Sequence, residues 1–322
     1  MKAAVYYHNG GPEVFSYEDV PEPVNKPNEI LIRVKSISIE GGDLINREIR
    51  PLRSVPNIVG YQCAGEVIAV GSGVKNKKVG QRVVAITRGG SHAEIVAAED
   101  LRSFILPNAL SYEVGSAIPT VFFTAHECLF TFGNLKAGES VLIHGGSGAL
   151  GIAAIQLAKQ AKAIVFTTGA DDEKLNRLKD LGADFLINYK SRAFDEVVLE
   201  LTKGQGVNLI IDSVGGNNLS KSVNALAYRG MITFIGVAGR DATLFDPTLL
   251  WPKNATITGV YAPASTDHEH ERFRQTVEQA LKDVAGQKLK MHIDKTFPLS
   301  QAREAHQYIL DKKAFGRVLL IP

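Results

Sequence analysis

A glycine-rich turn carries the strongest chemical signal in the sequence. It reads HGGSGALGIAAIQLAK, and Gly146, Gly148 and Gly151 give it the spacing G-x-G-x-x-G. An apolar run of the β type precedes the turn and a helical run follows it, which is the context that dinucleotide binding requires. The first glycine permits the bend, the second lets backbone approach a pyrophosphate, and the third lets helix pack on strand. The helix N-terminus would offer its unpaired amides to the phosphates.

The end of the next strand predicts which dinucleotide binds. An NAD site has a carboxylate there for the ribose hydroxyls, whereas this strand ends in Thr167–Gly169. Lys174 follows on the next helical turn, and Tyr189 ends the third strand. A hydroxyl, a glycine amide, a cation and a phenol suit a 2′-phosphate, so we expect NADP(H). Asp171 and Asp172 stand close by and are the argument for NAD(H), unless they cap the following helix.

The elements around this turn indicate a doubly wound α/β domain. Short β-rich runs alternate with helical stretches from about residue 140, and their spacing leaves room for one crossover helix each. Nearly continuous Val, Ile and Leu runs are typical of parallel strands buried on both faces. The expected strands cover residues 141–145, 163–167, 184–187, 207–212, 231–236 and 256–260.

The residues before 120 have a different pattern. Strand-like pieces broken by Gly and Pro, without regular helical crossovers, predict a β-rich domain with a partly closed barrel. The last sixty residues mix helices and strands and are expected to fold back onto this domain. We therefore expect a catalytic domain at 1–120, completed by 265–322, a cofactor domain at 121–264, and a ligand cleft between them.

The composition of the chain argues against nucleic acid and membrane partners and against secretion. The 322 residues carry a net charge of +2 from evenly scattered acids and bases, which argues against nucleic acid binding. The N-terminus does not resemble a secretory signal, and no run approaches the roughly 20 apolar residues of a membrane span. The only cysteines, Cys63 and Cys128, are too few for a disulfide framework. We expect a cytoplasmic protein without membrane partners.

Several segments together resemble one family. They are the glycine turn, MKAAVYYHNGGPEVF at the N-terminus, VGSGVKNKKVGQRV, LTKGQGVNLIIDSVGG, and FGRVLLIP at the C-terminus. The sequence resembles the zinc-independent medium-chain dehydrogenases/reductases, in the quinone oxidoreductase or zeta-crystallin-like branch, from end to end. The resemblance implies a GroES-like catalytic domain and a Rossmann domain, NADPH between them, and a homodimer.

The resemblance also implies roles for individual residues. The pyrophosphate would meet Gly148, Ala149 and Leu150, and the 2′-phosphate would meet Gly169, Lys174 and Tyr189. Residues near the nicotinamide or elsewhere on the cofactor would be Gly236, Val237, Val260, Tyr261, Ala262, Thr124 and Arg317.

One departure from the family pattern concerns the acceptor. Relatives carry Asn-Pro-x-Asp where this chain has IEGGD, so that Glu40 replaces the asparagine and Asp43 is kept. A carboxylate beside a quinone oxygen is unfavourable unless it is protonated or turned away. Glu40, Asp43, Thr124 and Tyr261 are the pocket candidates, and no catalytic residue is assigned.

A zinc site is not expected. The metal-dependent relatives need a thiolate, an imidazole and a further acidic ligand, but Tyr61 occupies the histidine position and Cys63 is displaced and alone. His144 is interpreted as a strand-end residue that makes a backbone contact. Cys128 is interpreted as a core residue.

The expected reaction is metal-free hydride transfer from NADPH to a quinone or similar conjugated acceptor. Two alternatives remain open: an NADPH-dependent enone or enoyl reductase, and a non-catalytic NADPH-binding sensor or structural protein. The apolar segment TITGV at residues 256–260 could pair across a two-fold axis in a dimer.

Overall fold

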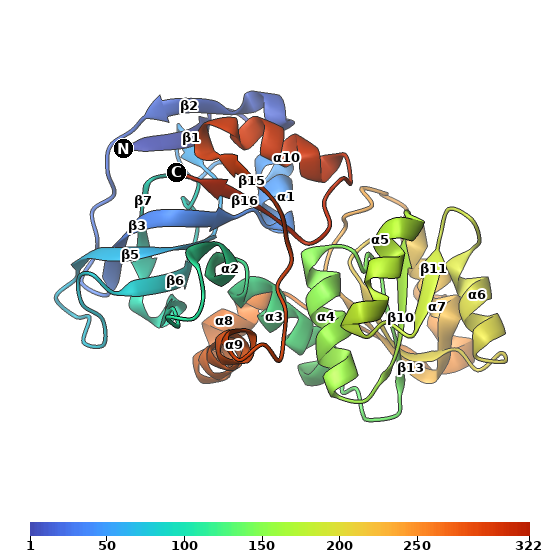
Figure 1. The fold of residues 1–322 in the computed structure, drawn as a ribbon. Helices are drawn as coiled ribbons and strands as arrows, with labels where there is room; N and C mark the ends of the chain where they lie inside the picture. Colours follow the sequence, from blue (N-terminus) through green and yellow to red (C-terminus); the bar gives the residue numbers. More distant parts are fainter. The chain divides into compact units, whose positions relative to one another are not determined.

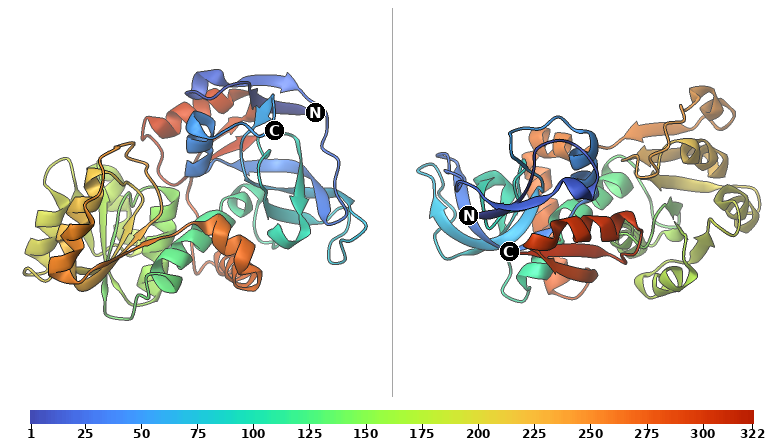
Figure 2. Two further views of the ribbon diagram at one scale, coloured as in Figure 1. Left: turned by 180° about the vertical axis from the view of Figure 1, so that it is seen from behind. Right: turned by 90° about the horizontal axis from the view of Figure 1, so that it is seen from above.

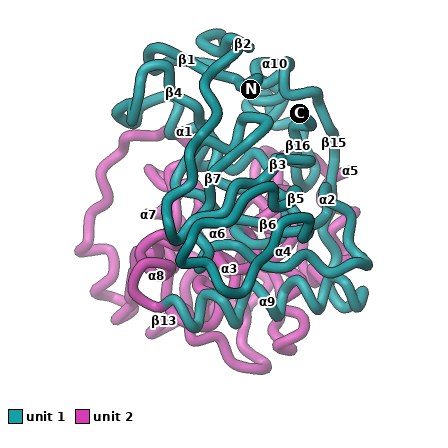
Figure 3. The backbone as a smooth tube through the Cα atoms, turned by 90° about the vertical axis from the view of Figure 1, so that its left-hand side faces the viewer, with its two compact units in different colours: residues 1–120, 270–322 teal, residues 121–269 magenta.

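Six parallel strands form one sheet in residues 121–269, which we call unit 2 (Figures 1 and 3). The protein is described by a computed structural model that covers residues 1–322. The strand order is β11-β10-β9-β12-β13-β14, so the order reverses direction between β9 and β12. The strands are β9 (Ser140–Ile143), β10 (Ile164–Gly169), β11 (Phe185–Asn188), β12 (Val207–Asp212), β13 (Leu226–Phe234) and β14 (Thr256–Gly259). The predicted doubly wound parallel sheet is confirmed.

Helices connect these strands and cover the sheet. In Figure 1, α4 and α5 lie on one side of the strands, and α6 and α7 on the other. Buried Leu142, Phe166 and Ile210 belong to the core beneath them. The helices of this part are α3 (Pro119–His126), α4 (Ala149–Gln160), α5 (Asp172–Arg177), α6 (Phe194–Leu201), α7 (Asn217–Ala225) and α8 (Ala262–His268).

Residues 1–120 and 270–322 make up unit 1, which is rich in β-structure. A seven-stranded sheet follows the order β15-β16-β3-β5-β6-β8, with β7 paired to β3, and a second sheet has the order β2-β1-β4. The first sheet contains β3 (Glu29–Ser38), β5 (Gln62–Val70), β6 (Arg82–Ile86), β7 (Ile95–Glu99), β8 (Ser103–Ile105), β15 (Ile293–Pro298) and β16 (Arg317–Ile321). The second contains β1 (Lys2–Tyr6), β2 (Ser16–Asp19) and β4 (Asn57–Ile58).

The two segments of unit 1 are joined through their strands. β16 runs antiparallel to β3, with Leu319 opposite Ser38, and the two chain termini lie near each other in Figures 1 and 2. The helices of this unit are α1 (Gly41–Ile49), α2 (Tyr112–Ser116), α9 (His270–Ala285) and α10 (Ala302–Leu310). The sequence placed the second domain boundary between residues 264 and 265, whereas the two units divide between residues 269 and 270, five residues later.

Two short helices have local signals at their ends. Helix α1 was not predicted, and it begins where the Asp43 carboxylate accepts a hydrogen bond from the Glu40 amide, over 2.9 Å. The other is α5, which follows β10. It ends at Arg177, a short 3₁₀ turn follows, and Gly182 ends the segment with a left-handed φ of 107°.

Candidate functional site

The glycine turn lies between β9 and α4, where the strand order of unit 2 reverses. Gly145 has a φ of 66°, and the Gly148 amide donates to its carbonyl over 3.0 Å. A Cβ at position 151 would lie 2.6 Å from both the Gly145 oxygen and the Gly146 Cα. Gly151 therefore lets the first turn of α4 pack directly on the bend, as a dinucleotide site requires.

The first turn of α4 offers unbonded amides. Gly148 is the N-cap residue, no side chain caps the helix, and the first intrahelical bond runs from the Ile152 amide to the Gly148 carbonyl. The amides of Ala149, Leu150 and Gly151 therefore have no acceptor within the helix. Together with the helix dipole, they form an anion-binding group that fits a pyrophosphate.

Both threonine hydroxyls at the end of β10 are used within the sheet. Thr167 and Thr168 are both buried. The Thr167 hydroxyl donates to the Ile143 carbonyl over 2.9 Å, and the Thr168 hydroxyl lies 3.1 Å from Nδ1 of His144. Sequence reasoning missed this because alternation along a strand does not show which hydroxyls neighbouring strands satisfy.

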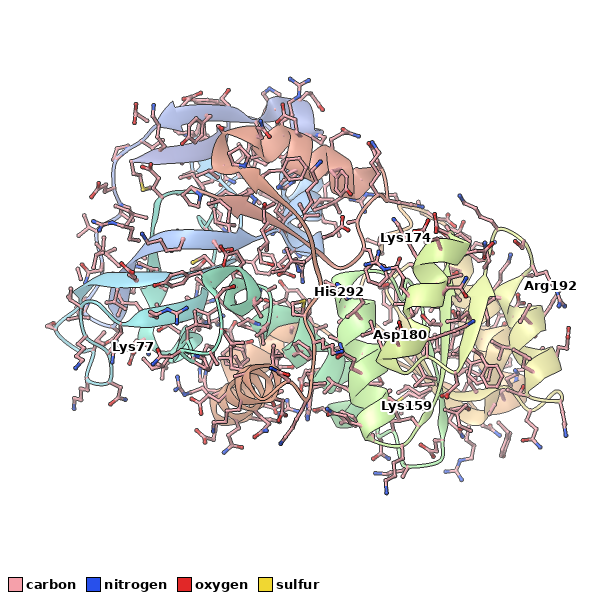
Figure 4. All side chains as sticks on the ribbon, in the orientation of Figure 1. Lys77, Lys159, Lys174, Asp180, Arg192 and His292 are labelled. Carbon is pink, nitrogen blue, oxygen red and sulfur yellow. The ribbon has the colours of Figure 1, made fainter.

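The carboxylates after β10 are used within the local structure. The Asp171 side chain accepts the Lys174 amide over 2.9 Å and caps α5, and Asp172 accepts a hydrogen bond from Asn188 over 2.8 Å. The interpretation of Asp171 as a helix cap is confirmed. Lys174 projects from α5 (Figure 4), and the Tyr189 amide donates to the Gly169 carbonyl over 3.1 Å. The carboxylates of Asp171 and Asp172 are thus both used in local hydrogen bonds near the end of β10.

The other expected cofactor residues also follow strand ends of the same sheet. Gly236 and Val237 come after β13, and residues 260–262 come after β14. Because all six strands are parallel, these segments and the glycine turn share the carboxyl edge of the sheet. Tyr261 is 56% exposed at the N-cap of α8. Thr124 lies half-buried on α3, away from any strand end in sequence.

In unit 1, Glu40 and Arg317 form a buried ion pair. The Glu40 Oε2 atom lies 2.8 Å from Nη2 of Arg317, and Nη1 donates to the Ile39 carbonyl over 2.7 Å. Glu40 is 3% exposed and Arg317 is 6% exposed. Arg317 begins β16 and Glu40 follows β3, so the antiparallel pairing of these two strands brings the charges together.

Two further side chains hold the Glu40 carboxylate. The Ser38 hydroxyl and the Gln62 amide donate to its Oε1 atom over 2.9 and 3.2 Å. Gln62 also bonds the Ser116 carbonyl and, through its own oxygen, Thr120. Burial raises the pKa of Glu40, although the Arg317 charge and the Ser38 hydroxyl act in the opposite direction.

Asp43 is the second buried acid of this cluster. Burial raises its pKa well above the usual range, and the nearby Glu40 charge acts in the same direction. The Glu40 carboxylate is therefore paired with the Arg317 guanidinium, beside an Asp43 whose pKa burial raises. Glu40 therefore does not present a free negative charge, which removes the objection to a carboxylate at this position.

Neither cysteine has the properties of a nucleophile. Cys63 and Cys128 are free and buried, and burial raises the pKa of each thiol to about 12. No group of three or more His, Cys, Asp or Glu side chains is placed to hold a metal ion.

The structure corrects the interpretation of His144. Its side chain makes side-chain contacts, with Thr168 on one ring nitrogen and Ser222 on the other, rather than a backbone contact. Ser222 is 78 residues away on α7, so no local pattern in the sequence could have indicated this partner.

Comparison with known proteins agrees with both units. Residues 26–129 match the family described as alcohol dehydrogenase GroES-like domain, and residues 149–282 match the family described as zinc-binding dehydrogenase. The quinone oxidoreductase of Sus scrofa is 32% identical over 328 residues, covering 100% of this chain and 98% of the relative. The human synaptic vesicle membrane protein VAT-1 homolog is 28% identical over 317 residues, covering 93% of this chain and 80% of that protein.

A solved structure gives the same result. The Escherichia coli quinone oxidoreductase, in a complex with NADPH, is similar with a TM-score of 0.96 and 28% sequence identity, over 100% of both chains. No helix in the present structure has the length and apolarity needed to cross a membrane. The GroES-like and Rossmann units, with the end-to-end similarity to the pig protein, show that the chain belongs to the quinone oxidoreductase family of medium-chain dehydrogenases/reductases.

Proposed function

We propose that this protein is an NADPH-dependent oxidoreductase that transfers a hydride, without a metal, to a quinone or a similar conjugated acceptor. The observation that carries the proposal is the uncapped α4 N-terminus behind a glycine turn, in a chain similar over its full length to quinone oxidoreductases. NADPH in the complex of the E. coli relative supports the choice of cofactor.

The residues at the carboxyl edge of unit 2 would hold the cofactor. The amides of Ala149 and Leu150 would bind the pyrophosphate, because α4 leaves them without acceptors. Gly169, Lys174 and Tyr189 would bind the 2′-phosphate, since Asp171 is used as a helix cap. The proposed contacts with the nicotinamide half are Gly236, Val237, Val260, Tyr261 and Ala262, with Thr124 beside them.

Arg317 and the acids of unit 1 have a different proposed role. The Arg317 guanidinium is held by Glu40 and the Ile39 carbonyl, so its contribution is to neutralise Glu40 rather than to pair with a phosphate. The neutral surroundings suit an uncharged, electron-poor acceptor. Asp43, whose pKa is raised by burial, stays a pocket candidate of this unit.

Bound NADPH would supply the hydride, and the chain's own groups would orient the two reactants and exclude water. A quinone needs no dedicated general acid, because its two-electron reduced form is stabilised by resonance and takes up protons from water. A hydroxyl such as that of Thr124 would stabilise negative charge developing on the acceptor oxygen.

The test is oxidation of NADPH and of NADH, followed by loss of absorbance, against a benzoquinone, a naphthoquinone, an enone and a simple aldehyde. We expect turnover of both quinones with preference for NADPH. Turnover of the enone alone would identify a double-bond reductase instead. NADPH binding without any turnover would contradict the enzymatic proposal and favour a sensor or structural role.

We also propose that the protein is a homodimer and acts in the cytoplasm. Edge strand β14 follows exposed Trp251, which is 74% accessible, and Leu244 is 92% accessible in the preceding loop. Exposed apolar residues beside an open sheet edge are typical of a surface that pairs with a second copy.

A further inference from the structure

A chain of hydrogen bonds runs beneath the glycine turn, through side chains that no other part of the proposed mechanism uses. It connects Thr168 at the end of β10, His144 after β9, Ser222 on α7 and Asp212 at the end of β12. The three heavy-atom distances along it are 3.1, 3.0 and 2.8 Å, and all four residues are buried.

The directions of the two bonds nearest Asp212 follow from that residue. The Asp212 carboxylate accepts hydrogen bonds from the Val214 and Gly215 amides, from Asn218 and from the Ser222 hydroxyl. Because Ser222 has only one proton and donates it to Asp212, its oxygen must accept the bond from His144.

This places a proton on Nε2 of His144, which Ser222 accepts. In a neutral ring, Nδ1 is then the acceptor for the Thr168 hydroxyl, whereas a doubly protonated ring would donate to it instead. Burial lowers the pKa of His144, with the Asp212 charge acting in the opposite direction, which agrees with a neutral ring. Phe194 packs its ring edge to face against the imidazole, with the ring centres 4.6 Å apart.

The other end of the chain holds the turn itself. The Thr168 hydroxyl, whose proton points to His144, accepts the Gly145 amide over 3.3 Å. The Thr168 carbonyl accepts the next amide, that of Gly146, over 3.0 Å. One residue thus holds two successive amides of the bend that leads into α4.

We infer that Thr168, His144 and Ser222 are positioning residues, which transmit a fixed hydrogen-bond direction from Asp212 to the glycine turn and so orient the α4 amides toward a pyrophosphate. The inference rests on the proposed use of NADPH, but it concerns the pyrophosphate that NADPH and NADH share. The expected loss of affinity is therefore the same for NADPH and NADH, and it does not depend on which acceptor is reduced.

The test measures dissociation constants of NADPH and NADH, by fluorescence, for Thr168→Val. Valine keeps the shape but removes the hydroxyl that links His144 to the Gly145 amide. We expect both cofactors to bind about fivefold more weakly, since one hydrogen bond is lost, and Thr168→Ser to restore binding. Saturating cofactor should restore most of kcat, because the effect acts on binding.

A matched control is Thr233→Val. Thr233 is also buried in the same sheet, and its hydroxyl donates to a strand carbonyl, that of Ile210, rather than to the turn. Its cofactor affinities should stay within twofold of the unmodified protein. Equal weakening by Thr168→Val and Thr233→Val would overturn the positioning role.

Two measurements address His144 directly. Nitrogen-15 NMR of the imidazole, assigned by its loss in His144→Gln, should show a protonated Nε2 and an unprotonated Nδ1, and the opposite tautomer would overturn the chain. In His144→Asn the amide oxygen can replace Nδ1 as the acceptor for Thr168, whereas glutamine reaches only toward Ser222. The asparagine variant should therefore bind cofactor more tightly than the glutamine variant.

Failure of the positioning role can be told apart from failure of the proposed reaction. If the protein binds both cofactors but reduces no quinone, the reaction proposal fails while the Thr168 comparison still decides the inference. If it binds neither cofactor, the positioning role fails together with the proposed function, and the tautomer measurement reports whether the hydrogen-bond chain itself exists.

Discussion

Individual side chains in this protein acquire their chemistry from partners that are distant in the sequence. Glu40 looks incompatible with a quinone oxygen when it is read alone, but Arg317 lies 2.8 Å away across two paired strands. The charge that Glu40 presents therefore depends on the register between β3 and β16.

The buried ion pair leads to a stability prediction. Glu40→Gln leaves the Arg317 guanidinium buried without a charged partner, so the free energy of unfolding should fall by about 3 kcal/mol. Urea unfolding measures this change. The matched control is Glu200→Gln, which removes the partner of Arg192 at an exposed pair and should leave the unfolding midpoint unchanged. Equal effects of the two substitutions would contradict the role assigned to Glu40.

The phosphate preference leads to a second residue-scale prediction. Lys174→Ala should raise KM for NADPH about tenfold and leave KM for NADH unchanged, because only NADPH has the 2′-phosphate that a cation would bind. Lys179→Ala, which removes an exposed lysine from the following 3₁₀ turn, is the control for net charge. Parallel losses for both cofactors would argue that Lys174 supports the fold of α5 instead.

At the scale of elements, the periodic parts of the chain were predicted well and the packed irregular parts were not. Every strand of the parallel sheet and the helix α4 lie where the apolar runs placed them, because burial on both faces leaves a clear sequence pattern. Helix α1 was missed at both ends: its start is a local capping contact between Asp43 and the Glu40 amide, and its far end is held by buried Arg47, which contacts His306, 259 residues away. The Arg47 contact is tertiary, so propensity and periodicity do not report it.

The far end of α1 is tied to other elements by two histidines. Arg47 on α1 lies 2.6 Å from Nδ1 of His306 on α10, and the Nε2 atoms of His306 and His92 are 3.1 Å apart. Phe15 contacts both imidazoles and the guanidinium. Burial, followed by the Arg47 charge, lowers the pKa of His92 to about 3; burial, followed by the charges of His92 and Arg47, lowers that of His306 as well.

This cluster predicts a loss of stability in mild acid. The unfolded chain binds protons on these histidines below about pH 6.5 while the folded chain does not, so the free energy of unfolding should fall as the pH drops from 6.5 toward 3. Above pH 6.5 both states hold neutral rings and the cluster gives no pH dependence. Urea unfolding at several pH values measures the slope.

The double variant His92→Gln/His306→Gln provides the comparison for this slope. It removes both titrating groups, so its stability should depend less steeply on pH between 6.5 and 5 than that of the unmodified chain. An unchanged slope would place the acid sensitivity elsewhere in the protein.

At the scale of the whole molecule, the sequence indicated both units and their fold classes, because strands alternate with crossover helices in one unit and lack them in the other. The contribution of residues 270–322 to unit 1 follows from β16 pairing with β3. The acceptor was not predictable, since acceptor specificity depends on loop shape rather than on a motif. In the proposed dimer, the open edge at β14 would pair with a second copy of the chain.

The proposed dimer leads to a prediction for the whole molecule. Light scattering coupled to gel filtration should give the mass of two chains for the unmodified protein. The double substitution Leu244→Glu/Trp251→Glu places charges beside the β14 edge and should shift the mass to one chain. Val24→Glu alters an equally exposed apolar residue in unit 1 and should leave the dimer intact. A single-chain mass for the unmodified protein would refute the proposal.

The pairing of β16 with β3 has a consequence for how the chain is made. During translation, residues 121–269 are made as a complete unit before β16, so the first 120 residues must wait for a partner strand that begins only at Arg317. Until then Glu40 has no cationic partner and β3 has an open edge. The nascent N-terminal segment is therefore exposed to aggregation and proteolysis until β16 has been made.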